Sequence, residues 1–181
     1  MAMAVMTIGV SGVIAMQTVT ATSNRHARTL SMATRVAQAW LDQLAAEAGQ
    51  WNASGELSQT VWLQQVNSAG GAWFRPAYDT TRNFGPAFDA LGNPVATDDI
   101  ATDAHYCTDL QLIWLFDESR GSGLIRANVR VFWFRSSVVA LANDPPSHVC
   151  ELTPDEIDGA DGGRLMRMVY LSTAIRQEYI Q

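Results

Sequence analysis

The sequence predicts an α+β protein in which one long N-terminal helix precedes an antiparallel sheet. Two patterns support this prediction. Between Leu30 and Leu44, apolar residues recur at spacings of three and four, which is the period of one helix face. After residue 104, apolar residues recur at every second position, which is the period of a strand. An apolar helix stripe and the apolar faces of strands cover one another, so we expect one layer of each.

The composition narrows the classes of function. Of the 181 residues, 48% are hydrophobic and 17% are charged, as in a single folded domain. The formal net charge is −6 and no basic stripe occurs, which argues against nucleic acid as a partner. The chain contains no serine-hydrolase motif, zinc-protease motif or glycine-rich phosphate loop, so we expect neither an enzyme nor a bound cofactor.

The first 24 residues carry no charged side chain, and Arg25 is the first charged residue of the chain. A cleaved signal peptide would have a basic region before the apolar run, and none is present. A core helix of a small domain would be amphipathic, and the nearly unbroken apolar run of residues 1–16 is a poor amphipathic pattern. A membrane helix needs about 20 apolar residues, which this segment approaches. Gly9 and Gly12 would then allow bending or close helix packing, although apolar helices also tolerate glycine.

Helix-compatible sequence continues to Ala48, and Gly49 is a plausible stop. We therefore expect one continuous helix from the terminus to about Ala48, roughly 70 Å long at 1.5 Å per residue. Its second half is amphipathic, with Asp42 and Glu47 among the residues off the apolar stripe. The residues expected to pack on the sheet are Leu30, Ala33, Val36, Ala37, Trp40, Leu41 and Leu44.

The sequence after residue 48 predicts a connecting region followed by a sheet. Residues 56–68 have the pattern of a short helix, and residues 69–104 are rich in Gly, Pro, Asn and Asp and therefore mostly irregular. Residues 108–116 and 124–135 form a predicted hairpin around the turn DESRGSG, and residues 164–179 form a third strand. On the second strand, Ile125, Ala127, Val129, Val131 and Trp133 share one face, opposite Arg126, Asn128 and Arg130.

Three phrases carry a resemblance to a known family. They are MAMAVMTIGVSGVIAMQ at the start, the phrase from Ala33 to Leu41 within SNRHARTLSMATRVAQAWLDQL, and MVYLSTAIRQ near the end. Together they resemble type IV pilin-like proteins, and specifically minor pilins of the PilV type. The helix match is the more specific part, whereas the rest of the chain matches in layout.

The resemblance implies a role and a location. The first half of the helix would protrude, anchor the subunit in the inner membrane, and later pack in the filament core. The globular domain would face the periplasm and then the pilus tip at the cell surface. Partners would be other minor pilins, the major pilin and a large tip adhesin, in pili that serve adhesion and twitching motility. The helix residues implied in membrane insertion and assembly are Val5, Ile8, Gly9, Val10, Gly12, Val13 and Ile14.

The same reading divides the chain into an apolar segment, 1–24, and a globular part, 25–181. The globular part comprises an amphipathic helix at 25–48, a connecting region at 49–104, and the sheet with its loops at 105–181. The chain departs from the family because the cleavage motif, with its glycine and following glutamate, is absent. Met1 aligns a few residues past that glutamate, so either the reading frame begins earlier or the chain is truncated. Processing by a prepilin peptidase is therefore assigned to no residue.

In an exported domain, the pair Cys107 and Cys150 favours a disulfide. Each cysteine also follows a histidine by two positions, at His105 and His148, so a zinc site is an alternative. Two acidic clusters with neighbouring glycines invite calcium, but neither has the spacing of a calcium-binding loop, and solvated loops are the default. They are Asp98, Asp99 and Asp103, and Asp155, Glu156, Asp158 and Asp161.

Two other functions remain open at this point. A minor pseudopilin of a type II secretion system would share the fold and serve a secretion pseudopilus. A signal-anchored periplasmic binding domain would have a ligand pocket within its sheet domain, and its helix would stay in lipid.

Overall fold

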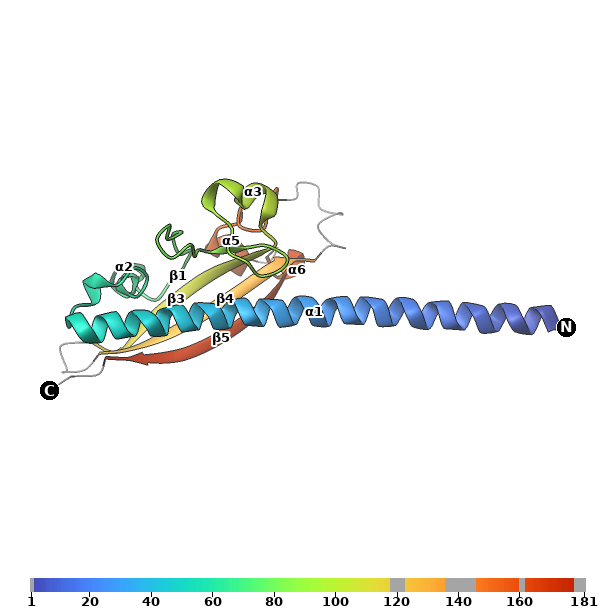
Figure 1. The fold of residues 1–181 in the computed structure, drawn as a ribbon, viewed down its shortest axis with the longest axis horizontal. Coiled ribbons are helices and arrows are strands. Elements are labelled where there is room, and N and C mark those ends of the chain that lie inside the picture. The colour runs from blue at the N-terminus through green and yellow to red at the C-terminus, as the bar shows by residue number, and fades with distance from the viewer. Residues whose placement is uncertain (1, 118–122, 136–145, 160–161, 178–181) are drawn as a thin grey trace. The chain divides into compact units, whose positions relative to one another are not determined.

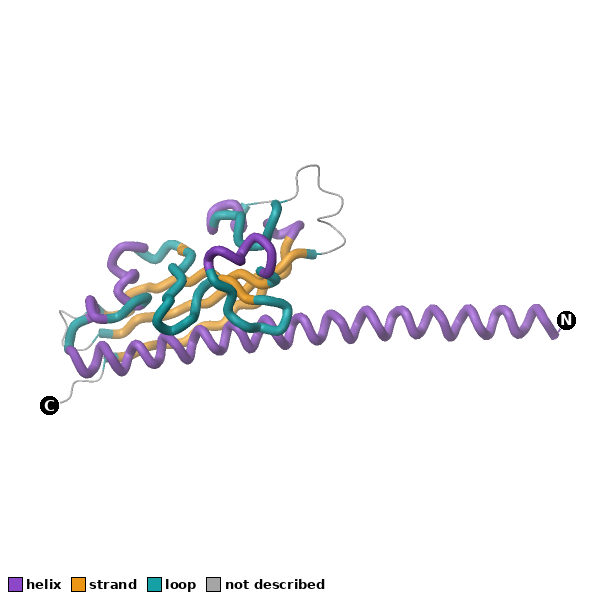
Figure 2. Tube along the Cα trace, turned by 45° about the horizontal axis from the view of Figure 1, so that its top comes forward, coloured by secondary structure: helices purple, strands orange, loops and turns teal. Residues whose placement is uncertain are grey.

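The computed structural model describes residues 2–117, 123–135, 146–159 and 162–177, with the backbone alone for residues 2–15 and 162. The fold is α+β: helix α1 (Ala2–Ser54) precedes an antiparallel sheet of five strands (Figures 1 and 2). The chain divides into two compact units, Met1–Met32 and Ala33–Gln181. Each unit is described in turn.

The first unit is the part of α1 up to Met32. The hydroxyls of Thr20 and Thr22 donate to the carbonyls of Met16 and Thr18, four residues earlier, so these polar side chains are satisfied by the helix itself. Apolar side chains here are open to solvent: Met16 is 75% exposed and Leu30 is 51% exposed. Leu30 lies in this unit, so its expected packing on the sheet stays a prediction.

In the second unit, α1 presents a buried stripe that begins at Ala33 and extends to Trp51. Leu41 lies beside this stripe and is half-buried. The helix passes the expected stop at Gly49 and ends at Ser54, where Gly55 has a φ of +74° and donates its N–H to the carbonyl of Trp51. Helix formation continues past Gly49 because burial of Trp51 requires one more turn. The buried stripe consists of Ala33, Val36, Ala37, Trp40, Leu44, Glu47 and Trp51.

Short elements replace the single helix expected at residues 56–68. These are η1 (Leu57–Gln59), η2 (Leu63–Gln65) and α2 (Val66–Ala69). A regular helix does not form because the backbone N–H groups of residues 61–63 donate to a side chain of α1. The following region is mostly irregular, as expected. Its regular elements are β1 (Trp73–Phe74), β2 (Ala87–Phe88), η3 (Thr97–Asp99) and α3 (Ile100–Asp103).

Three long strands form the body of the sheet: β3 (Tyr106–Phe116), β4 (Leu124–Phe134) and β5 (Met166–Arg176). The strand order is β1-β3-β4-β5, with β2 also paired to β3, and all pairs are antiparallel. The third strand is shorter than expected because residues 162–165 form helix α6 (Gly162–Leu165). Helix α5 (Pro154–Asp158) lies in the connection between β4 and β5.

The sheet buries side chains on both faces. Ile125, Ala127, Val129 and Val131 of β4 are fully buried on one face. On the other face, Cys107 and Phe132 lie in a cluster with Val149, Ile157 and Met166, which come from the β4–β5 connection and the start of β5. Trp51 of α1 contacts Trp114 of β3, with ring centroids 5.9 Å apart. Trp40 contacts Trp62 and Phe84, so aromatic rings join α1 to the connecting region.

Candidate functional site

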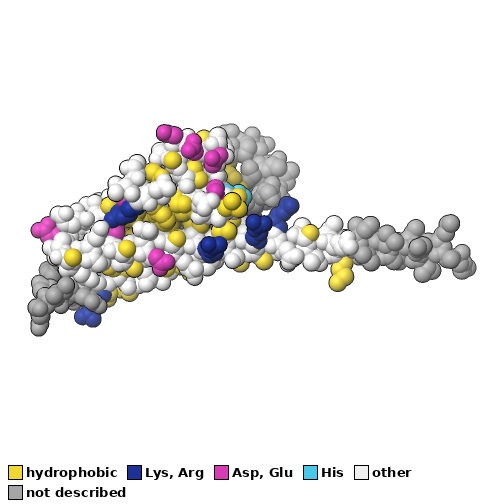
Figure 3. Space-filling model, in the orientation of Figure 1, with side chains coloured by type: hydrophobic (Ala, Val, Ile, Leu, Met, Phe, Trp, Pro, Cys, Tyr) yellow, Lys and Arg dark blue, Asp and Glu magenta, His cyan; other side chains and the backbone are white. Residues whose placement is uncertain are grey.

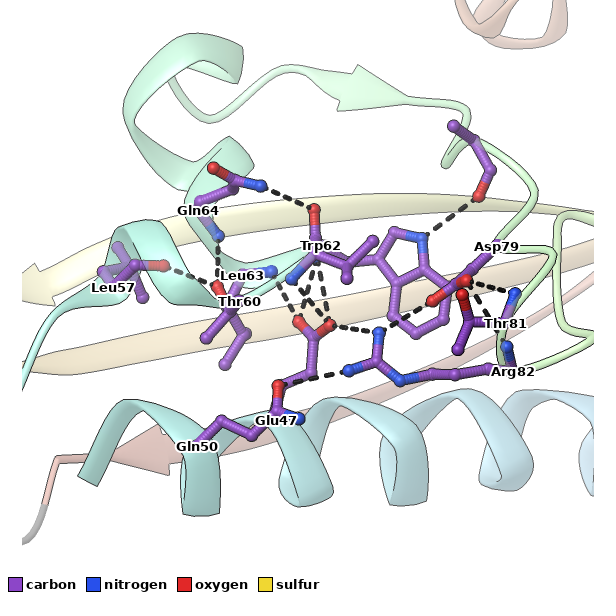
Figure 4. Close-up of polar contacts among 12 residues, drawn as sticks. Glu47, Gln50, Leu57, Thr60, Trp62, Leu63, Gln64, Asp79, Thr81 and Arg82 are labelled. Atoms are coloured by element: carbon purple, nitrogen blue, oxygen red, sulfur yellow. Dashed lines mark hydrogen bonds and ion pairs between the residues drawn. The ribbon is translucent and has the colours of Figure 1, made fainter. Parts of the chain in front are cut away.

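A buried carboxylate on α1 organises the segment that follows the helix (Figure 4). The side chain of Glu47 is 1% exposed. One of its oxygens accepts hydrogen bonds from the N–H groups of Val61 (2.9 Å) and Trp62 (3.2 Å), and the other from Trp62 and Leu63 (both 2.9 Å). Three consecutive backbone N–H groups that converge on one carboxylate form an anion-binding concavity, and a residue of the same chain fills it.

Arg82 completes this carboxylate site. Its guanidinium donates to Glu47 at 3.2 Å, to Asp79 at 2.9 Å and to the side-chain oxygen of Gln50 at 3.1 Å. The guanidinium also lies over the ring of Trp62, 5.2 Å from its centroid. The carboxylate of Glu47 is thus saturated with donors, and it ties the end of α1 to residues 61–63 and 79–82.

A second buried ionic cluster lies on the sheet. Asp109 of β3 and Arg130 of β4 are both fully buried and form an ion pair at 3.0 Å. Arg75 donates to the other oxygen of Asp109, also at 3.0 Å. The guanidinium of Arg130 lies over the ring of Trp73 of β1, 4.5 Å from its centroid. Burial raises the pKa of Asp109 above its ordinary value, although the charges and hydrogen bonds of Arg75 and Arg130 oppose this shift.

The same two arginines hold the connection between β4 and β5. Arg75 donates to the carbonyls of Cys150 and Leu152, and Arg130 donates to the carbonyl of Pro154 and to Asp158. The described residues 146–159 are thereby attached to the sheet. Helix α5 begins with a capping box in which Thr153 and Glu156 satisfy one another's backbone N–H groups.

The disulfide lies in this same segment. Cys107 of β3 and Cys150 are joined, with their Cα atoms 5.4 Å apart. Their sulfurs are therefore not available as the thiolate ligands of the zinc alternative. Among the described residues, no group of three or more His, Cys, Asp and Glu side chains is arranged to hold a metal ion. In the second acidic cluster, Glu156 caps α5 and Asp158 pairs with Arg130, whereas Asp161 lies outside the described residues.

The residues expected in membrane insertion and assembly all lie in α1, in the part for which the structure describes the backbone alone. Their side chains are thus outside the described residues. Among the helices that the structure describes, none is both long enough and apolar enough to cross a membrane. The residues concerned are Val5, Ile8, Gly9, Val10, Gly12, Val13 and Ile14.

Sequence reasoning missed both buried ionic clusters. Glu47 lies three residues after Leu44 and four before Trp51, so it continues the apolar stripe, and that position was a signal of burial. Arg130 lies on the face of β4 on which it was expected. That face was expected to be polar, and its burial was not expected. The burial of Arg130 depends on residues 146–159, which come from the irregular connection after β4. No local pattern in the sequence places that connection on the sheet.

Comparison of the chain with models of known protein families, with curated proteins and with solved structures finds no match. The assignment of a function therefore depends on the sequence pattern and on the geometry described above.

Proposed function

We propose that this chain is a minor pilin of the PilV type, a subunit of a type IV pilus. In this role it belongs to a small tip complex that primes pilus assembly and can hold a large tip adhesin. The finer description of the fold follows: the first half of α1 protrudes, and its second half packs on the sheet, as in type IV pilin-like proteins. The subunit acts through contacts with other subunits, so its function requires no catalytic site.

The observation that supports this proposal most is the pairing of one unbroken helix with an antiparallel sheet. The beginning of α1 has an uncharged sequence up to Asn24, whereas the part after Ala33 carries a buried stripe. Such a helix suits a subunit that is anchored in the inner membrane and later packs among apolar helices in a filament. The disulfide suits a domain that is exported to an oxidising compartment.

A charge placed in the first part of α1 tests this role. Arginine at the centre of a membrane helix costs about 2.5–3.5 kcal/mol on insertion scales, and an unpaired charge in a packed apolar bundle is also unfavourable. We expect Val10→Arg to reduce membrane retention and to abolish co-purification of the tagged chain with other pilin-like subunits. Arg135→Glu, at an exposed residue directly after β4, is the matched control and should leave both unchanged.

Assembly of the Val10→Arg variant at the level of the unaltered chain would remove the basis for a pilin role. The partners that co-purify separate the alternatives. Subunits of a type II secretion system would identify a pseudopilin. A chain that stays in the membrane without any pilin-like partner would fit a signal-anchored binding domain.

A further inference from the structure

Strand β5 is an edge of the sheet. In the strand order β1-β3-β4-β5 it has one described neighbour, β4, and its pairing with β4 runs from Met166 to Arg176 without a register shift. Figures 1 and 2 show this strand along the margin of the sheet. At a rise of about 3.3 Å per residue, the open edge from Arg167 to Arg176 is about 30 Å long.

The ladder between β4 and β5 shows which backbone groups face outward. At its two ends, Arg135 donates its N–H to the carbonyl of Leu165, and Gln177 donates to the carbonyl of Gly123, both at 2.8 Å. In an antiparallel pair, hydrogen-bonded positions alternate along the strand. The odd-numbered residues of β5 are therefore bonded to β4. The backbone N–H and C=O groups of Met168, Tyr170, Ser172 and Ala174 point away from it.

The usual protections of an edge strand are missing from β5. Natural edge strands are kept short, interrupted by proline, distorted by bulges, or charged along their length. β5 has 11 residues, contains no proline, and has no charged side chain between Arg167 and Arg176. Tyr170 contacts the ring of Trp73 but is 56% exposed, so part of an aromatic ring also lies open at the middle of the strand. A long regular edge with these features is suited to pairing with another strand.

The charge around β5 indicates what kind of strand would pair there. Residues 123–135 and 162–177 contain six arginines and no Asp or Glu, in a chain of net charge −6. Arg130 is neutralised internally, whereas Arg126, Arg164 and Arg176 are exposed. Figure 3 shows described acidic side chains gathered over the region of α3, where η3 and α3 carry Asp98, Asp99 and Asp103. The nearest carboxylates in the sequence, those of Asp161 and Glu178, are outside the described residues.

A second copy of the chain is a poor occupant of this edge. Pairing β5 of one copy with β5 of another would bring together two margins that are both rich in arginine. Like charges held near one another are destabilising, and residues 162–177 of a second copy contain no Asp or Glu to offset them. We propose that the open edge of β5 binds an extended segment of a different protein, one with carboxylates at the ends of an apolar, strand-forming centre. The added strand would be held by backbone hydrogen bonds and selected by the arginines.

Amide hydrogen exchange on the full chain in detergent tests the proposal directly. The probe is a peptide of alternating Thr and Val with two carboxylates at each end, and its counterpart carries Lys at the same positions. Without peptide, the amides of Met168, Tyr170, Ser172 and Ala174 should exchange faster than those of the intervening residues. The acidic peptide should slow these four amides at least about tenfold and bind at least about tenfold more tightly than the Lys peptide. The preference should shrink at high salt.

Two variants separate backbone pairing from charge. Ala174→Pro removes an outward N–H, which an edge strand tolerates, and should abolish peptide binding, whereas Ala174→Thr should retain it. Arg176→Glu should weaken the preference for the acidic peptide over the Lys peptide. Unchanged exchange of the four amides with the acidic peptide, or equal binding of both peptides, would overturn the proposal. Protection that grows with the concentration of the chain alone would show self-pairing and would also overturn it. This test does not depend on the pilin assignment.

Discussion

Replacing Glu47 with alanine leaves the backbone N–H groups of Val61, Trp62 and Leu63 without their shared acceptor. The N–H groups of Trp62 and Leu63 are buried, and each buried donor left unsatisfied costs about 1–3 kcal/mol. Arg82 loses its contact with Glu47 but keeps its hydrogen bonds to Asp79 and Gln50. We expect Glu47→Ala to lower the free energy of unfolding by about 4 kcal/mol, which matches the typical effect of breaking a buried ion pair.

Unfolding of the full chain in detergent, followed by tryptophan fluorescence, measures this change. For a domain of this size, the expected loss corresponds to a decrease of about 8–16 °C in Tm. Glu47→Gln keeps one acceptor oxygen and should lose about half as much. Asp42→Ala changes an exposed carboxylate on the same helix and is the matched control, with no expected change. A loss below about 1 kcal/mol for Glu47→Ala, or an equal loss for Asp42→Ala, would refute the reasoning.

Two further predictions concern the disulfide and pH. Reduction of Cys107–Cys150 opens a link between residues 43 positions apart, for which the chain-entropy model gives a loss of about 4 kcal/mol, so dithiothreitol should lower Tm and a chelator should not. An unchanged Tm after complete reduction would contradict this. Burial opposes ionisation of Asp79 and Asp89, but hydrogen bonds from Thr81 and Arg82 and from Asn93, respectively, outweigh it and hold both pKa values below the ordinary value. The stability that these two groups contribute is complete above about pH 4 and decreases as the pH falls through their lowered pKa values. Asp79→Asn should flatten part of that decrease in unfolding experiments below pH 4, and a variant with the same acid profile as the unaltered chain would count against it.

The sequence was sufficient to predict the parts of the fold that depend on local period. The helix stripe and the alternation along β3 and β4 are spacings of apolar side chains, and burial of those side chains selects helix and strand respectively. The end of α1 was predicted wrongly because Gly49 is a permitted helix residue when a buried tryptophan follows it. The buried stripe also begins at Ala33, later than the apolar pattern, which already includes Leu30.

The buried charges were not predictable from period in the same way. A pattern that sorts residues into apolar and polar assigns every carboxylate and guanidinium to solvent. Asp109 and Arg130 are buried because each finds the other, and because Arg75 and residues 150–158 bring further donors and acceptors from distant parts of the chain. Arg75, for example, lies 34 positions from Asp109 and 77 positions from Leu152 along the sequence. Only the folded chain brings them together.

The presence of this chain in assembled pili tests the central proposal most directly. Surface pili would be sheared from cells, separated from membranes, and analysed by mass spectrometry, with antibody labelling to locate the chain along the filament. We expect the chain in the pilus fraction, at low abundance relative to the major pilin, with label at filament ends. Its complete absence from purified pili, with all of it retained in the inner membrane, would contradict the account.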